Sequence, residues 1–204
     1  MNNKSKYNSK AKDSFKTKFN IYLFGKILND KVDSIAWEDI SAFDLEANEK
    51  LRAQYTTEYY QYEETELIDK KKSIKEIYQS FKEWKEKNIE EYKRLELLYI
   101  ESFEKVFLFK EFELMIKSDE CCYCEVTESK IILLSDKNQL FKKNLRGWNM
   151  EVERFDSNLE YTKDNCAMAC YWCNNAKTDE FTKEEFQPIA DQIKLVWETR
   201  LAEK

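Results

Sequence analysis

The sequence is poor in residues that interrupt regular structure, since its 204 residues include one proline and two glycines. Because these residues mark turns, their scarcity favours long helices over many hairpins. Histidine is absent, so no imidazole can act as a general base. No apolar run approaches the length of a membrane span. The first residues, MNNKSKYNSKAKDSFK, lack the apolar core of a secretory signal. These absences predict a cytoplasmic protein without membrane association.

Charge is unevenly distributed along this acidic chain, whose formal net charge is −6. Residues 1–26 carry seven lysines and one aspartate, whereas residues 27–120 carry a net −9. An acidic chain is a poor non-specific binder of nucleic acid, because phosphate contacts drive such binding. Residues 1–18 therefore have two interpretations, a basic arm that touches a nucleic-acid backbone or a solvated, disordered terminus.

Residues 19–117 are predicted to form a helical domain. Residues 18–28 (KFNIYLFGKIL) are an apolar run too short for periodicity to separate a strand from the start of a helix. Residues 44–69 contain good helix formers and no breaker, which predicts a helix there.

Residues 73–117 give the strongest helical signal. Apolar residues recur there mostly at three- and four-residue steps from Ile74 to Phe107, which is the pattern of an amphipathic stripe. We expect one break near Lys87 and Asn88, because helices of this length are uncommon in globular domains. The stripe is either the core of a helical domain or a coiled-coil arm for dimerisation, and its aromatic content favours the core.

The composition changes from residue 118, where cysteines and β-branched residues appear. Three short runs are predicted to be strands, at residues 130–134, 150–155 and 165–169. Thr182 and Glu185 form a capping-box pattern, which predicts a helix that extends to about Ala202. Pro188 is expected in the first turn of that helix.

Two C-x-x-C pairs separated by 45 residues are the best-defined motif in the chain. Such pairs form tight knuckles that direct thiolates at one ion, and four thiolates are a typical structural zinc site. We therefore predict one structural Zn²⁺ held by Cys121, Cys124, Cys170 and Cys173. The alternative is four unrelated buried thiols. Of the two remaining cysteines, Cys166 is expected in the core and Cys122 outside the metal site.

A set of polar residues lies inside and just after the loop between the cysteine pairs: Glu153, Arg154, Tyr161, Asn165 and Asn174. Over residues 121–186 this pattern resembles the HNH family of nucleases, the ββα-metal or His-Me finger fold. The resemblance implies an α+β protein, with a mainly helical N-terminal part and a zinc-stapled ββα-metal domain over residues 118–204. It also implies that Glu153 and Asn174 bind a catalytic Mg²⁺ or Mn²⁺ and that Asn165 orders the loop.

Arg154 stands where the family has its histidine general base. Arginine is effectively always protonated, so Arg154 cannot take that role and would instead clamp a phosphate oxygen. The chain thus resembles a subset of HNH enzymes, some of them restriction endonucleases, in which arginine replaces histidine and a tyrosine assists. Tyr161 would then be the base or would position the attacking water. Lys177 would either add a phosphate contact or be a solvated helix residue.

The function implied is a metal-dependent DNA endonuclease of the restriction or phage-defence type. A single ββα site cuts one strand, so double-strand cleavage needs a homodimer or a protein partner. Residues 19–117 would supply that dimerisation or DNA docking. The alternatives are a catalytically silent zinc-binding interaction module and a nuclease subunit of a larger complex.

Overall fold

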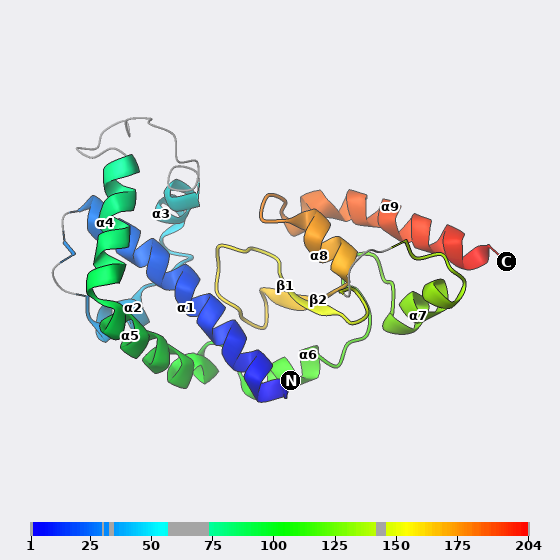
Figure 1. The fold of residues 1–204 in the computed structure, drawn as a ribbon, viewed down its shortest axis with the longest axis horizontal. Coiled ribbons are helices and arrows are strands. Elements are labelled where there is room, and N and C mark those ends of the chain that lie inside the picture. Colours follow the sequence, from blue (N-terminus) through cyan, green and yellow to red (C-terminus); the bar gives the residue numbers. More distant parts are fainter. Residues whose placement is uncertain (1, 30, 33–34, 57–73, 142–145, 204) are drawn as a thin grey trace. The chain divides into compact units, whose positions relative to one another are not determined.

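The computed structural model describes residues 2–29, 31–32, 35–56, 74–141 and 146–203 (Figure 1). The chain divides into two compact units. The N-terminal unit comprises residues 1–106 with Asn158–Glu160, and the C-terminal unit comprises residues 107–157 and 161–204. The sequence places the change in composition at residue 118. Residues 107–117 nevertheless belong to the C-terminal unit, where the rings of Phe107 and Phe112 pack with centroids 5.8 Å apart.

The N-terminal unit begins with helix α1 (Asn3–Leu28), so the prediction of a disordered arm over residues 1–18 is wrong. The Asn2 side chain caps this helix by accepting from the backbone N–H of Ser5 at 2.8 Å. Buried apolar residues follow at four-residue steps among the lysines, namely Tyr7, Ala11, Phe15 and Phe19. That spacing places them on one face of the helix, so burial orders this segment despite its charge.

Two short helices follow, α2 (Trp37–Ala42) and α3 (Glu49–Gln54). The ambiguous run at residues 18–28 is part of α1 and is helical. Of the helix predicted over residues 44–69, the described part contains α3, and residues 57–69 lie outside the described ranges.

The amphipathic stripe forms helices α4 (Ile74–Lys87) and α5 (Ile89–Ser102), followed by the 3-10 turn η2 (Phe103–Lys105). The predicted break is confirmed, because Asn88 separates the two helices. The stripe packs on α1 within the same chain: Phe19 lies 5.3 Å from the ring of Trp84 and 5.1 Å from that of Tyr92. The stripe is therefore a helical core.

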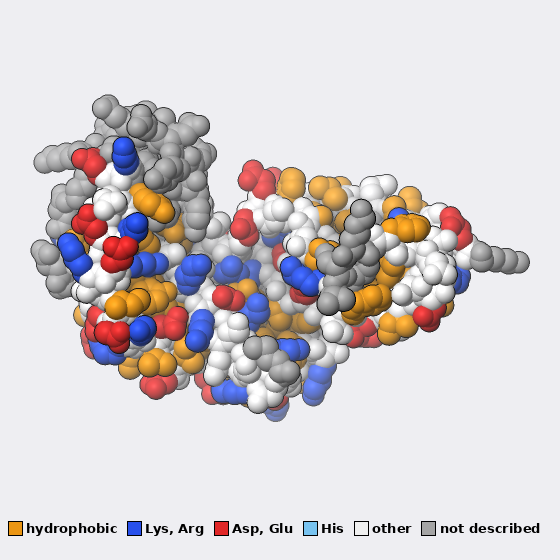
Figure 2. All heavy atoms as spheres, in the orientation of Figure 1, with side chains coloured by type: hydrophobic (Ala, Val, Ile, Leu, Met, Phe, Trp, Pro, Cys, Tyr) orange, Lys and Arg blue, Asp and Glu red, His pale blue; other side chains and the backbone are white. Residues whose placement is uncertain are grey.

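The exposed face of the N-terminal unit mixes acidic and basic side chains, as Figure 2 shows. On α4 and α5 these residues pair at three- and four-residue steps, as in Lys82–Glu86 and Arg94–Glu91. Exposed pairs of this kind each contribute only about 0.3–0.5 kcal/mol. They keep the surface solvated while the aromatic core stabilises the unit.

The C-terminal unit contains helices α6 (Phe109–Met115) and α7 (Glu128–Asp136). The strand predicted over residues 130–134 is wrong, since that segment lies in α7. Thr127 caps α7 by accepting from the backbone N–H of Lys130. Ile131 and Leu134 are buried three residues apart, whereas Ile132 and Leu133 are exposed. The cap and this helical spacing override the β-branched composition.

The other two strands are confirmed as β1 (Glu151–Arg154) and β2 (Cys166–Ala169), an antiparallel hairpin. Glu151 faces Ala169 and Glu153 faces Ala167 across the hairpin. The alanine side chains are small, so this face of the sheet has room for the acidic side chains and for a helix packed above them.

That helix is α8 (Tyr171–Lys177), which is followed by the long helix α9 (Lys183–Ala202). The capping box of Thr182 and Glu185 at the start of α9 is confirmed. Pro188 lies one turn later than predicted, inside the helix. Among the described residues, no helix has the length and hydropathy needed to cross a membrane.

Candidate metal centre and active site

The first cysteine knuckle is a tight turn that bridges Cys121 and Cys124. The backbone N–H of Cys121 donates to Val126 at 3.0 Å, and that of Glu125 donates back to Cys121 at 3.0 Å. Glu125 adopts a left-handed conformation with φ of 57°, which closes the turn. The N–H of Cys122 donates to Met168 of β2 at 2.9 Å, so the knuckle is fixed to the hairpin.

The second knuckle is formed where β2 runs into α8. Cys170 is the N-cap residue of α8, and its sulfur accepts from the backbone N–H of Cys173 at 3.4 Å. Both knuckles therefore derive from the ends of regular elements, which fixes their separation.

The four sulfurs of Cys121, Cys124, Cys170 and Cys173 form one cluster, with all ligand atoms within 4.8 Å of one another. The Sγ atoms of Cys124 and Cys170 are 3.7 Å apart. A zinc ion with Zn–S bonds of about 2.3 Å has S···S edges of about 3.8 Å in a tetrahedron. A disulfide needs about 2.05 Å. The arrangement fits a closed four-thiolate zinc site.

Electrostatics supports the same assignment. The other three thiols hydrogen-bond to Cys121 and hold its pKa far below the usual value for a thiol. The same contacts, together with burial, raise the pKa of Cys170 and Cys173. Contacts with Cys121 raise the pKa of Cys124, but those with Cys170 and Cys173 outweigh them and lower it. Two thiolates are thus stabilised at the expense of the other two, and ionising all four requires a cation at the centre. Cys166 is buried in β2 and Cys122 is exposed, and neither belongs to the cluster.

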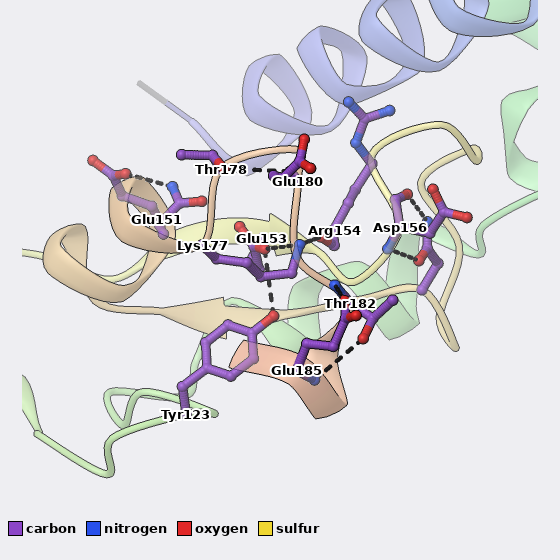
Figure 3. Close-up of polar contacts among 12 residues, drawn as sticks. Tyr123, Glu151, Glu153, Arg154, Asp156, Lys177, Thr178, Glu180, Thr182 and Glu185 are labelled. Carbon is purple, nitrogen blue, oxygen red and sulfur yellow. Dashed lines mark hydrogen bonds and ion pairs between the residues drawn. The ribbon is translucent and has the colours of Figure 1, made fainter. Parts of the chain in front are cut away.

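Glu153 of β1 lies beneath α8 and is only 5% exposed. Its Oε1 atom is 3.3 Å from Nζ of Lys177 and accepts from the hydroxyl of Tyr123 at 3.4 Å. Burial raises the pKa of the Glu153 carboxyl, and the Lys177 ammonium opposes that shift. Burial and the Glu153 carboxylate also raise the pKa of Tyr123. Figure 3 shows Lys177 and Tyr123 both directed at Glu153.

Asn174, which is predicted to share an ion with Glu153, hydrogen-bonds to a second carboxylate, that of Glu151. Its side-chain amide donates to Glu151 at 2.7 Å, and Arg146 binds the same carboxylate through Nε and Nη2. Asn174 and Lys177 are three residues apart on α8, and Glu151 and Glu153 are two apart on β1. One face of the helix therefore pairs with one face of the strand, residue by residue.

Arg154 and Tyr161 form a separate pair. The Arg154 guanidinium lies over the Tyr161 ring, 4.6 Å from its centroid, and Tyr161 is buried. Successive strand residues point to opposite faces, so Arg154 extends away from the Glu153–Lys177 pair (Figure 3). The stacking fixes the guanidinium plane and orders both side chains.

Asn165 orders the connection between the strands. Its Oδ1 accepts from the backbone N–H of Asp156 at 2.9 Å, and its Nδ2 donates to the carbonyl of Asp156 at 2.9 Å. The backbone N–H of Asn165 donates to Thr162 at 3.1 Å. These contacts close the loop just beyond Arg154.

The structure thus brings the predicted residues into two groups on one hairpin. Glu153 and Asn174 both lie on the interface between β1 and α8, while Arg154, Tyr161 and Asn165 lie around the loop. Sequence reasoning missed Tyr123, Glu151 and Arg146 as partners in the first group. Only the two-residue spacing of Glu151 and Glu153 signals a shared strand face. The carboxylates and the Asn174 amide supply oxygen donors of the kind that Mg²⁺ and Mn²⁺ bind.

No model of a known protein family matches the chain, and no curated protein matches it. Among solved structures, it is similar to the rare-cutting HNH restriction endonuclease PacI, with 26% identity and a TM-score of 0.38. The match covers 46% of this chain and 66% of that chain, less than two thirds of the enzyme. A TM-score of this size does not establish a common fold.

Proposed function

We propose that this protein is a metal-dependent DNA endonuclease of the HNH type, acting in restriction or phage defence. The observation that carries the proposal is the cysteine-anchored hairpin and helix. That unit places Glu153 of β1 against the face of α8 that carries Asn174 and Lys177. Carboxylate, amide and ammonium groups on so small a scaffold suit the binding of a phosphodiester with a divalent ion.

Glu153 and Asn174 are the residues that would hold Mg²⁺ or Mn²⁺. Such an ion stabilises the charge that develops on the phosphate and on the leaving oxygen. The Arg154 guanidinium would bind a non-bridging phosphate oxygen as a charged clamp. Asn165 fixes the loop that directly follows this clamp on β1.

Hydrolysis needs a water whose oxygen attacks phosphorus as the bond to the leaving 3′ oxygen breaks. Tyr161, held under Arg154, would take the proton of that water, or would orient the water while solvent takes the proton, because Arg154 cannot. The leaving 3′ oxygen would take its proton from solvent. One such site cuts one strand. Cleavage of both strands would therefore require a homodimer or a protein partner.

The test is nicking of supercoiled plasmid by the zinc-loaded protein with Mg²⁺ or Mn²⁺, alongside a labelled RNA substrate. Asn174→Ala should abolish cleavage and leave zinc content unchanged. The control is Asn175→Ala, because that exposed neighbour donates to the backbone of Tyr171 within the same helix. An Asn174→Ala variant that nicks DNA at the wild-type rate would contradict the site assignment.

A second function is favoured by the same contacts. Glu153 is already paired with Lys177, and Asn174 with Glu151, which suits a catalytically silent zinc module that binds a partner protein. A nuclease subunit of a larger complex is the related alternative. Purified protein that cleaves neither DNA nor RNA favours the silent module, whereas cleavage restored by a co-purified partner favours the subunit.

A further inference from the structure

Lys177 is the most deeply buried charged side chain among the described residues, at 1% exposure. Its Nζ lies 3.3 Å from Oε1 of Glu153 and donates to the backbone carbonyl of Arg154 at 3.4 Å. Lysine is almost never buried to this extent unless it is paired. The solvated helix lysine expected from the sequence as one alternative is therefore excluded, and Lys177 has a defined position over one carboxylate.

Arg146 also contacts this face of β1, but it is far more exposed to solvent than Lys177. Arg146 binds Glu151, but its side chain is 62% exposed, so water can replace that contact at little cost. The Lys177 ammonium, in contrast, has exchanged its hydration for the Glu153 carboxylate and one carbonyl. Separating this pair without a replacement charge would leave a buried charge uncompensated, which is strongly destabilising.

This position has a consequence for the ion that the endonuclease proposal requires. Mg²⁺ binds oxygen ligands at about 2.0–2.1 Å. An ion on Glu153 would therefore lie within a few ångströms of the Lys177 ammonium, and the two positive charges would repel each other. The single negative charge of Glu153 cannot neutralise both.

We propose that Lys177 is the resident counter-cation of Glu153, and that a divalent ion occupies this carboxylate only by displacing the Lys177 ammonium. Lys177 thereby sets the affinity of the ion site. The inference rests on the proposed function, because it takes Glu153 as the ion's carboxylate. It adds a positioning residue that acts through Glu153.

The test is Mn²⁺ binding, measured as the loss of the free-ion electron paramagnetic resonance signal with zinc-loaded, full-length protein. Lys177→Gln removes the charge but keeps a donor for Glu153, and it should bind Mn²⁺ on the order of tenfold more tightly than the wild type. The control is Lys183→Gln. Lys183 belongs to the same unit and lies over the Phe155 ring. Its replacement by Gln removes one positive charge, as Lys177→Gln does. Its Mn²⁺ affinity should stay within about twofold of the wild type.

A second substitution locates the gained ion. Glu153→Gln in the Lys177→Gln background should return Mn²⁺ affinity to the wild-type level or below, because the carboxylate is gone. If the gain persists, the ion lies elsewhere and the proposal is wrong. Equal Mn²⁺ affinity in the wild type and Lys177→Gln also overturns it.

Folding is followed in each variant by circular dichroism. Should Lys177→Gln be unfolded without ion, Mn²⁺ must refold it in a Glu153-dependent manner, and failure to do so counts against the proposal. Plasmid nicking is scored separately. A wild type that nicks DNA with unchanged Mn²⁺ affinity in Lys177→Gln refutes this inference alone, whereas tighter Mn²⁺ binding without any cleavage refutes the endonuclease proposal alone.

Discussion

The two units of this protein are stabilised in different ways. The N-terminal unit packs the face of α1 that carries Phe15 and Phe19 against aromatic rings of α4 and α5. The core of the C-terminal unit instead surrounds four cysteine sulfurs, and a Lys–Glu pair is buried beside it. A long aromatic stripe thus suffices for a helical unit, whereas a two-stranded hairpin with short helices needs an added cross-link.

The largest expected effect is on folding, because loss of zinc should unfold one unit and leave the other folded. Cys170→Ser, or removal of the ion with a chelator, should unfold the C-terminal unit. A structural zinc contributes on the order of 10–16 kcal/mol that is coupled to folding. The N-terminal unit should stay helical. Elemental analysis and limited proteolysis of the two units check this outcome.

The matched control for Cys170→Ser is Cys166→Ser, because Cys166 is buried but lies outside the sulfur cluster. It should cost about 1 kcal/mol and retain zinc. If protein purified without chelator contains no stoichiometric zinc, a metal cross-link cannot be what stabilises the C-terminal unit.

The next effect concerns the buried Glu153–Lys177 pair and its contribution to the stability of the C-terminal unit. Glu153→Ala should lower its free energy of unfolding by about 3–5 kcal/mol, because Lys177 would remain buried and unpaired. Zinc content should not change. Glu151→Ala is the control. Its partners are the exposed Arg146 and the half-buried amide of Asn174, which water can reach, so the change should cost about 1 kcal/mol.

A neutral replacement of both partners, Glu153→Leu with Lys177→Met, should recover most of the stability that Glu153→Ala loses. Chemical denaturation of the wild type and the three variants measures the series. Equal costs for Glu153→Ala and Glu151→Ala would show that burial does not set the two pairs apart.

A smaller effect is expected in the loop after β1, where a substitution should change the rate of cleavage and not the stability. Tyr161→Phe should lower the rate of DNA cleavage by roughly 10²-fold or more if the hydroxyl positions the attacking water. Folding should change little, because the ring still lies under Arg154. A fully active Tyr161→Phe variant, assayed by single-turnover nicking, would move that role to another group.

The smallest effect concerns Lys85, a half-buried charge in the N-terminal unit. Lys85 lies over the rings of Phe81 and Tyr92, at 4.7 and 5.2 Å, and donates to Asn20 at 3.0 Å. Burial, with a contribution from Lys16, lowers its pKa from 10.5 to about 8. Between these values the unfolded chain binds more protons than the folded one, so the free energy of unfolding should rise with pH from about 8 towards 10.5.

Lys85→Met should therefore raise the Tm of the N-terminal unit by a few degrees at pH 7 and flatten the rise between pH 8 and 10. Lys82→Met, on the exposed side of the same helix, should leave that slope unchanged. Thermal melts of the two variants over this pH range decide between them. A slope that survives in Lys85→Met would assign the titration to another group.

Local patterns were enough to predict several elements from the sequence. The capping box of Thr182 and Glu185 and the break at Asn88 depend on neighbours within one helical turn, and both are present. The C-x-x-C spacing likewise predicted one cluster of four sulfurs, because each knuckle is a local turn. The signal for α1 was also there, in the four-residue spacing from Tyr7 to Phe19, but the lysines between those residues obscured it.

What the tertiary structure alone decided is which polar groups meet. Lys177 is 24 positions from Glu153, and Tyr123 is 30 positions away, so no periodicity links them. The register of β1 against β2 and the docking of α8 place Glu153 under Lys177 and direct Asn174 to Glu151 instead. The segment at residues 130–134 shows the same limit, because a cap at Thr127 and a buried face outweighed its strand-like composition. Sequence fixes local geometry through backbone sterics and spacing, whereas the partner of a buried charge depends on how whole elements pack.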